Sequence, residues 1–156
     1  LNYMGSVVLG LNDALVELTG ALAGFTLALH SPQLIALTGS ITGVAAALSM
    51  ASSEYLSRKS DGETTSEAIQ ASIYTGTAYL LTVVILIVPF LLLSNVYISL
   101  VITLLAAILI IAGFNFYYSG VKEESFKRRF LEMAIISFTV ALISFGIGFV
   151  LDKFLG

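Results

Sequence analysis

The sequence predicts an all-α integral membrane protein with five transmembrane helices. Of its 156 residues, 58% are hydrophobic and only 11% are charged, and the mean hydropathy is +0.99. A soluble domain carries about 25% charged residues. The nonpolar residues also form long blocks, each long enough for the roughly 20 residues that cross a hydrocarbon core of about 30 Å.

The separators between these blocks contain helix-capping residues. Ser31 precedes Pro32, Asn95 follows a serine, and Thr64 with Glu67 forms a capping box, while Gly120 is a natural helix stop. The longest separator has about ten residues, so residues 1–156 are expected to form a single transmembrane domain of antiparallel neighbours. We expect the spans at about residues 3–29, 33–57, 68–93, 96–119 and 129–151.

The cations predict the orientation of the bundle. By the positive-inside rule, the loops after the second and fourth spans are cytoplasmic, whereas Lys153 lies on the other side. The N-terminus is then cytoplasmic and the C-terminus extracytoplasmic. The cations that decide this are Arg58, Lys59, Lys122, Lys127, Arg128 and Arg129.

Two acids interrupt the first apolar block. An ionised carboxylate at bilayer depth is costly unless it faces a partner, water or the bundle interior, so it is a functional hypothesis by default. Asp13 and Glu17 are four residues apart on one helix face. With a span that begins near Tyr3, they lie about 15 and 21 Å deep.

Further candidate ligands lie nearer the predicted cytoplasmic side. Met50 and Glu54 are again four apart, about 10 and 5 Å deep in the second span, and Glu132 is similarly shallow in the fifth. Oxygen ligands with a thioether favour iron(II) or manganese(II) over calcium or magnesium. Asp13, Glu17, Met50, Glu54 and Glu132 are therefore predicted to bind a transported metal, and we expect no resident cofactor.

These residues also have structural interpretations. Met50 could be a packing residue, and Glu54 and Glu132 could pair with Arg58 or Arg128 at the interface. Under that hypothesis the protein is a non-transporting membrane scaffold or helper subunit.

Small residues predict close helix approach. Gly20 and Gly24 form a small-xxx-small pair in the first span, as do Gly39 and Gly43 in the second. Since five helices are few to enclose an ion path, we expect a homodimer through the first span, with its Gly20/Gly24 face near the two-fold axis.

Three segments carry a family resemblance. Gly10–Glu17 (GLNDALVE), residues 47–57 (ALSMASSEYLS) and Ser144–Gly148 (SFGIG) resemble helices of the vacuolar iron transporter family. The resemblance implies a five-helix homodimer in the lipid bilayer that exports iron(II) or manganese(II) from the cytosol in exchange for protons. It assigns metal-path roles to Asp13, Met50 and Glu54.

Two features depart from the eukaryotic pattern of that family. Residues 58–67 stand where eukaryotic members insert a cytoplasmic metal-binding domain, and Asp13 is followed by Ala14 instead of glycine. Both features resemble the prokaryotic or archaeal branch, which implies a prokaryotic cell membrane. The initial Leu1 leads us to expect further residues upstream.

Enzymatic activity is not expected. An intramembrane aspartyl hydrolase needs two opposed carboxylates that share a proton, whereas Asp13 and Glu17 lie on one helix. No Ser-His or metal-hydrolase motif is present, and no nucleic-acid partner is expected.

Overall fold

The computed structural model describes residues 3–122 and 125–155, and the described segments are helical apart from short connections. The first span consists of α1 (Met4–Asp13), η1 (Ala14–Leu18) and α2 (Thr19–Leu29) in one continuous rod. Four single helices follow: α3 (Pro32–Ser60), α4 (Thr65–Leu92), α5 (Val96–Lys122) and α6 (Phe126–Leu155). By length and composition, five helices in the described part are able to cross a membrane, which confirms the predicted fold class.

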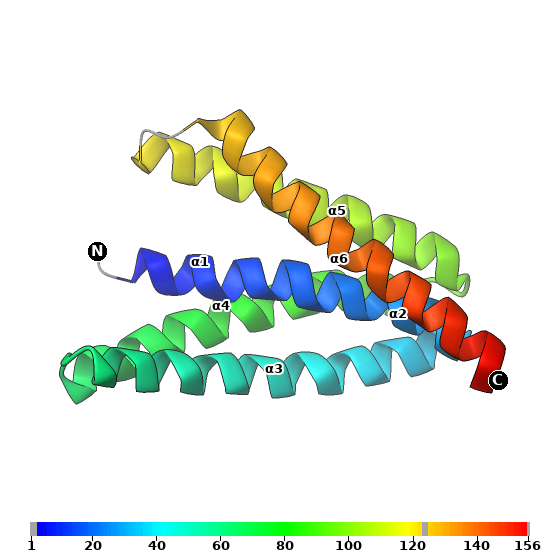
Figure 1. The fold of residues 1–156 in the computed structure, drawn as a ribbon, viewed down its shortest axis with the longest axis horizontal. Helices are drawn as coiled ribbons and strands as arrows, with labels where there is room; N and C mark the ends of the chain where they lie inside the picture. Colours follow the sequence, from blue (N-terminus) through cyan, green and yellow to red (C-terminus); the bar gives the residue numbers. More distant parts are fainter. Residues whose placement is uncertain (1–2, 123–124, 156) are drawn as a thin grey trace.

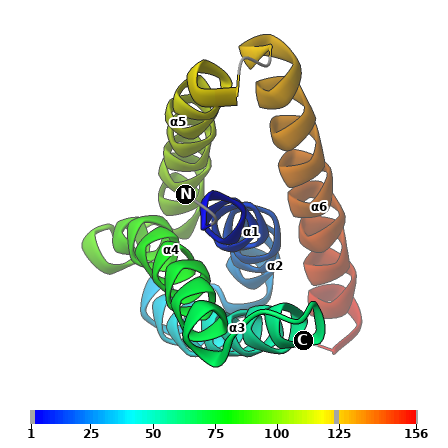
Figure 2. The same ribbon diagram turned by 90° about the vertical axis from the view of Figure 1, so that its left-hand side faces the viewer.

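The first span is the centre of the bundle. Figures 1 and 2 show it between the α3–α4 hairpin on one side and the α5–α6 pair on the other. It is also the most buried of the five spans, whereas α6 is the least buried. The start of α1, the α3–α4 connection, the end of α5 and the start of α6 lie at one end of the bundle, as the predicted topology requires (Figure 1). Side chains of the central rod are therefore the ones that can face several helices at once.

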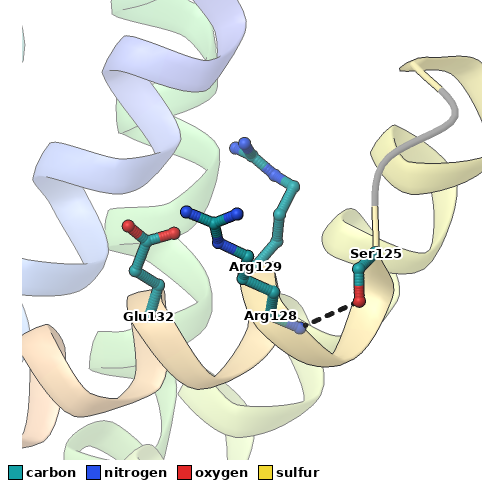
Figure 3. Close-up of a pocket in the computed structure, with 4 residues that line it drawn as sticks. All are labelled: Ser125, Arg128, Arg129 and Glu132. Carbon is teal, nitrogen blue, oxygen red and sulfur yellow. Dashed lines mark hydrogen bonds between the residues drawn. The ribbon is translucent and has the colours of Figure 1, made fainter.

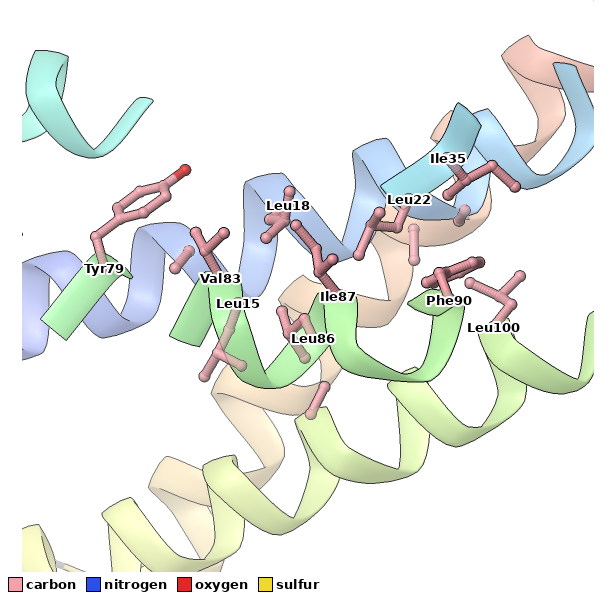
Figure 4. Close-up of a cluster of buried hydrophobic side chains, with 14 of the residues drawn as sticks. Leu15, Leu18, Leu22, Ile35, Tyr79, Val83, Leu86, Ile87, Phe90 and Leu100 are labelled. Carbon is pink, nitrogen blue, oxygen red and sulfur yellow. The ribbon is translucent and has the colours of Figure 1, made fainter. Parts of the chain in front are cut away.

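The apolar core lies where the first span meets α3, α4 and α5 (Figure 4). Leu15, Leu18 and Leu22 of the central rod pack with residues of α4 such as Leu86 and Phe90, and all five are at most 1% exposed. Many large apolar side chains on the outer helices are exposed instead. This distribution suits a protein surrounded by lipid, because a leucine side chain that faces apolar lipid tails carries no free-energy penalty for its exposure.

Three of the predicted helix starts are confirmed. Ser31 Oγ accepts a hydrogen bond from Leu34 N–H (3.4 Å) ahead of α3. The capping box forms between Thr64 and Glu67 at the start of α4, with bonds of 3.0 and 3.2 Å. Asn95 Oδ1 accepts from two backbone N–H groups of α5, at 2.9 and 3.0 Å. These side chains satisfy the free N–H groups of each first turn.

The predicted stop at Gly120 is wrong, because α5 continues through it to Lys122. A glycine permits the left-handed conformation that ends many helices but does not force it. The glycine with a positive φ among the described residues is Gly62 (φ 86°), in the turn after α3. Helix α3 also extends to Ser60, so that Arg58 belongs to its last turn instead of a loop. The Lys122 side chain, one of the six cations used for orientation, lies outside the described part.

The glycines of the first span permit a close approach within the chain. A Cβ at Gly24 would lie 3.1 Å from the Ser144 carbonyl oxygen, and one at Gly148 would lie 2.5 Å from the Gly24 carbonyl oxygen. At Gly20 a Cβ would meet a Val140 methyl at 2.8 Å. Helices α2 and α6 therefore pack backbone to backbone at this face, as small residues permit. The Gly20/Gly24 face, which we expected at the homodimer contact, is instead covered by α6 of the same chain.

Candidate metal path

The two acids of the first span lie at a π-helical turn. Asp13 is the last residue of α1, and Glu17 lies within η1, which has π-helical hydrogen bonding. Such turns are rare, occur mostly as single bulges inside α-helices, and are frequent at functional sites. Hydropathy and spacing gave no indication of this turn, because they do not distinguish it from an α-helical one. The acids thus lie where the backbone of the central span departs from regular geometry.

Asp13 and Glu17 form one polar group with Tyr79 of α4. The Asp13 carboxyl lies near both the Glu17 carboxyl and the Tyr79 hydroxyl, close enough for electrostatic interaction with each. Tyr79 is fully buried, Asp13 is half-buried and Glu17 is exposed on the isolated chain. Two carboxylates this close repel each other when both are ionised, and a cation bound between them would relieve that repulsion. This group is therefore chemically able to exchange a proton for a cation.

Glu54 belongs to a second polar group, nearer the predicted cytoplasmic end. Its Oε1 accepts from Arg58 Nε at 3.4 Å and its Oε2 accepts from Thr75 Oγ1 at 3.2 Å. The Arg58 guanidinium also donates to Ser6 Oγ at 2.9 Å and to both carboxylate oxygens of Glu63 at 3.2 Å. This group joins α1, α3 and α4. Glu54, only 8% exposed, therefore has the ion-pair partner that the structural interpretation assigned to it.

Helix periodicity connects the two groups. Thr75 and Tyr79 are one turn apart on α4, so that Thr75 reaches Glu54 while Tyr79 reaches Asp13. Met50 is one turn from Glu54 on α3 and is half-buried against the apolar core. Four residues advance about 6 Å along a helix. The arrangement is compatible with the predicted path from Glu54 past Met50 to Asp13.

Glu132 lies apart from these residues, on the other side of the central rod. It is exposed and borders a cavity of about 430 Å³ with Ser125, Arg128 and Arg129 at the start of α6 (Figure 3). Ser125 Oγ accepts from Arg128 N–H at 3.4 Å, as a helix cap. Arg129 lies 4.0 Å above the Tyr118 ring. Glu132 thus borders a cavity at the start of α6, and no hydrogen bond or ion pair among the described residues joins it to the Glu54 group.

The predicted ligands do not converge on one point. Among residues 3–122 and 125–155, no three histidine, aspartate or glutamate side chains are placed to hold a metal ion together. Asp13 and Glu17 form a pair, whereas Glu54 and Glu132 are in separate groups. The structure therefore holds the predicted ligands in separate polar groups, and their role in binding metal stays a prediction.

The comparison with protein families decides what kind of protein carries these groups. The family model described as the VIT family, that of the vacuolar iron transporters, matches residues 4–71. This matched segment, which is less than half of the chain, is called the VIT region below. The resemblance predicted from the first two helices is thereby confirmed, and Asp13, Glu17, Met50 and Glu54 all lie inside the VIT region. No curated protein matches the chain.

The VIT match indicates a metal-ion transporter, and the five long apolar helices indicate an integral membrane protein. A transporter is consistent with the expectation that the chain is not an enzyme. Tyr79 and Asn115 lie outside the VIT region, and neither was among the predicted site residues. A tyrosine and an asparagine inside long apolar blocks were the available signals, but only tertiary contacts show that Tyr79 meets Asp13 and that Asn115 meets Met133.

Proposed function

We propose that this chain exports iron(II) or manganese(II) from the cytosol in exchange for protons, in a prokaryotic cell membrane. The observation that supports this most is the Asp13–Glu17 pair, which lies on the π-helical turn of the central span and inside the VIT region. A charged side chain at mid-membrane costs at least about 2.5–3.5 kcal/mol, so two acids kept there need a functional reason. Exchange of a divalent ion for protons is such a reason.

The pair alternates between two occupants in this mechanism. When it is empty of metal, the carboxyls share a proton and Tyr79 holds Asp13 in place. A divalent cation favours ionisation of both carboxyls and displaces the proton. Because proton and metal compete for the same oxygens, exposing the pair alternately to the two sides of the membrane couples their movements in opposite directions.

Glu54 is the cytoplasmic entry to this path, with Arg58 as its resting partner. The guanidinium occupies one carboxylate oxygen at 3.4 Å, and an arriving metal has to displace it. The alternative partner for the released guanidinium is already in place, because Glu63 accepts from it at 3.2 Å. Met50, one turn deeper on α3, then provides a thioether between Glu54 and Asp13, which favours iron(II) over harder ions.

A second copy of the chain covers the exposed side of the first span in this proposal. Glu17 is exposed at mid-span on the isolated chain, although the span around it is the most buried of the five. A carboxyl that faced lipid at this depth would be strongly unfavourable. Since Gly20 and Gly24 already contact α6 of the same chain, the homodimer contact is proposed for the Glu17 face of the span.

Metal uptake into proteoliposomes tests this function. Wild-type protein should carry iron(II) and manganese(II) but little calcium, and Asp13→Asn should abolish the uptake. Asp152→Asn is the matched control, because Asp152 is a half-exposed acid that bonds His30 at the other end of the bundle (3.1 Å) and should leave uptake unchanged. Equal uptake by vesicles without protein and with wild-type protein would favour the scaffold hypothesis.

A further inference from the structure

A cavity of about 250 Å³ lies between the first span, α5 and α6, on the side away from Glu54. Its volume corresponds to about eight water molecules, enough for a partly hydrated ion. Four of its lining side chains offer lone pairs: the amides of Asn12 and Asn115, the carboxyl of Glu132 and the thioether of Met133. Asn12 directly precedes Asp13 in the first span. The cavity therefore borders the same central rod as the acid pair.

Asn115 is the decisive residue, because its carbonyl oxygen has no partner. The side chain is completely buried, and its Nδ2 donates to the Ile111 carbonyl at 2.8 Å and to Met133 Sδ at 3.5 Å. These two acceptors fix the orientation of the amide. Oδ1 is left buried without a hydrogen bond. An unsatisfied buried acceptor costs about 1–3 kcal/mol, so the site is arranged for an occupant that this oxygen can bind.

Nearby hydroxyls extend this polar character. Ser119 lies one turn after Asn115 on α5, and Ser137 lies one turn after Met133 on α6. Both hydroxyl oxygens are buried and have no hydrogen-bond partner. The facing helices thus present further polar atoms next to the contact between Asn115 and Met133. Apolar side chains at these positions would avoid burying unpaired polar atoms.

The cavity has an entrance from the predicted cytoplasmic side. Arg129 and Glu132 line both this cavity and the larger one of about 430 Å³ at the start of α6. The two spaces are therefore neighbours that share these two side chains. The guanidinium of one of them, Arg129, lies 4.0 Å above the Tyr118 ring.

We propose that this cavity is a second metal site, which binds iron(II) through Asn115 Oδ1, Met133 Sδ, the Glu132 carboxylate and the Asn12 amide. Three oxygens and one thioether favour a first-row transition ion over magnesium or calcium. The positive charge of Arg129 opposes a cation there, so the site is weak and releases its ion readily. The choice of ion rests on the proposed function, whereas the existence of the site does not.

The test measures binding in protein that lacks the central pair. Full-length Asp13→Asn, Glu17→Gln protein in nanodiscs is dialysed anaerobically against iron(II), and bound iron is counted. We expect about one iron per chain to remain. Met133→Leu keeps the side-chain volume, and in this background it should weaken iron(II) binding at least about tenfold. Met4→Leu removes a thioether outside the cavity and should change nothing.

Two further variants separate the possible outcomes. Asn115→Leu should also weaken binding, and it should not unfold the protein, because replacing an unsatisfied buried polar group by an apolar one is nearly neutral. Arg129→Gln should tighten binding, since it removes the opposing charge. Iron bound equally by the parent and by both the Met133→Leu and Asn115→Leu variants, or no iron bound by the parent, would overturn the proposal and leave the cavity to water. If the protein binds iron at this cavity but does not transport it, the proposed function is contradicted and the second site is not.

Discussion

Replacing Arg58 with methionine should destabilise the protein strongly, and replacing Glu54 as well should largely restore it. At the observed 3.4 Å and an effective dielectric constant near 20, the attraction between the two charges is about 5 kcal/mol before desolvation is counted. Removing one partner of a buried ion pair typically costs about 3–5 kcal/mol, because the other charge is left unpaired. Arg58→Met should therefore lower the free energy of unfolding by about 3 kcal/mol.

The assay is unfolding in mixed micelles by increasing fractions of sodium dodecyl sulfate, followed by far-ultraviolet circular dichroism. The double variant Arg58→Met, Glu54→Gln should lie within about 1 kcal/mol of wild type, since no charge is then buried alone. Lys59→Met is the matched control: this neighbouring cation bonds an exposed Thr65 hydroxyl at 2.9 Å, and its loss should cost under about 1 kcal/mol.

Metal distinguishes the two interpretations of Glu54. If Glu54 is a ligand, manganese(II) at about 100 times its dissociation constant should stabilise Arg58→Met by about 2.7 kcal/mol and the double variant much less. The single variant Glu54→Gln completes the comparison. If the losses of unfolding free energy in Arg58→Met and in Glu54→Gln simply add in the double variant, the reasoning about the ion pair is refuted. Coupling without any effect of manganese(II) would make Glu54 a structural residue.

Three other predictions concern selectivity, packing and topology. Met50→Leu keeps the volume but removes the sulfur, so iron(II) uptake should fall more than manganese(II) uptake, and an unchanged ratio would make Met50 a packing residue. Gly148→Ala places a Cβ 2.5 Å from the Gly24 carbonyl oxygen, and overpacking of this kind should cost about 1–3 kcal/mol in the same unfolding assay, whereas Gly146→Ala, with open space around it, should cost much less. A protease-sensitive tag at residues 60–64 should be cleaved only from the cytosolic side and one after the last residue only from outside; cleavage of both tags from one side would contradict five spans.

The sequence predicted the number and limits of the helices well, because each depends on local properties. Length and hydropathy define the spans, and Thr64 or Asn95 caps a helix through groups two or three residues away. Gly120 shows the limit of such rules: the residue permits a helix end, but the chain after it continues as helix. Whether a permissive residue is used depends on the packing of the following turn.

The candidate site was predicted only in part, because its contacts are made between spans. Asp13 and Glu17 stood out as acids in an apolar block, yet the π-helical turn between them depends on how the central rod packs. The partners of Glu54 show the same dependence: Arg58 at one turn was foreseeable, whereas Thr75, on another helix, was not. Asn115 appeared as a polar residue among apolar ones, without any sign that its carbonyl is unpaired.

The central claim is that Asp13 and Glu17 exchange a divalent metal for protons, and simultaneous measurement of both fluxes tests it most directly. Proteoliposomes that contain a pH-sensitive dye are given iron(II) or manganese(II) outside, and metal uptake and internal pH are followed in the same sample. The account predicts that metal uptake by wild-type protein is accompanied by proton efflux, and that the Asp13→Asn, Glu17→Gln variant shows neither. Wild-type proton counterflow retained in that variant would contradict the account and place the coupling elsewhere, with Glu54 and Glu132 as the next residues to test.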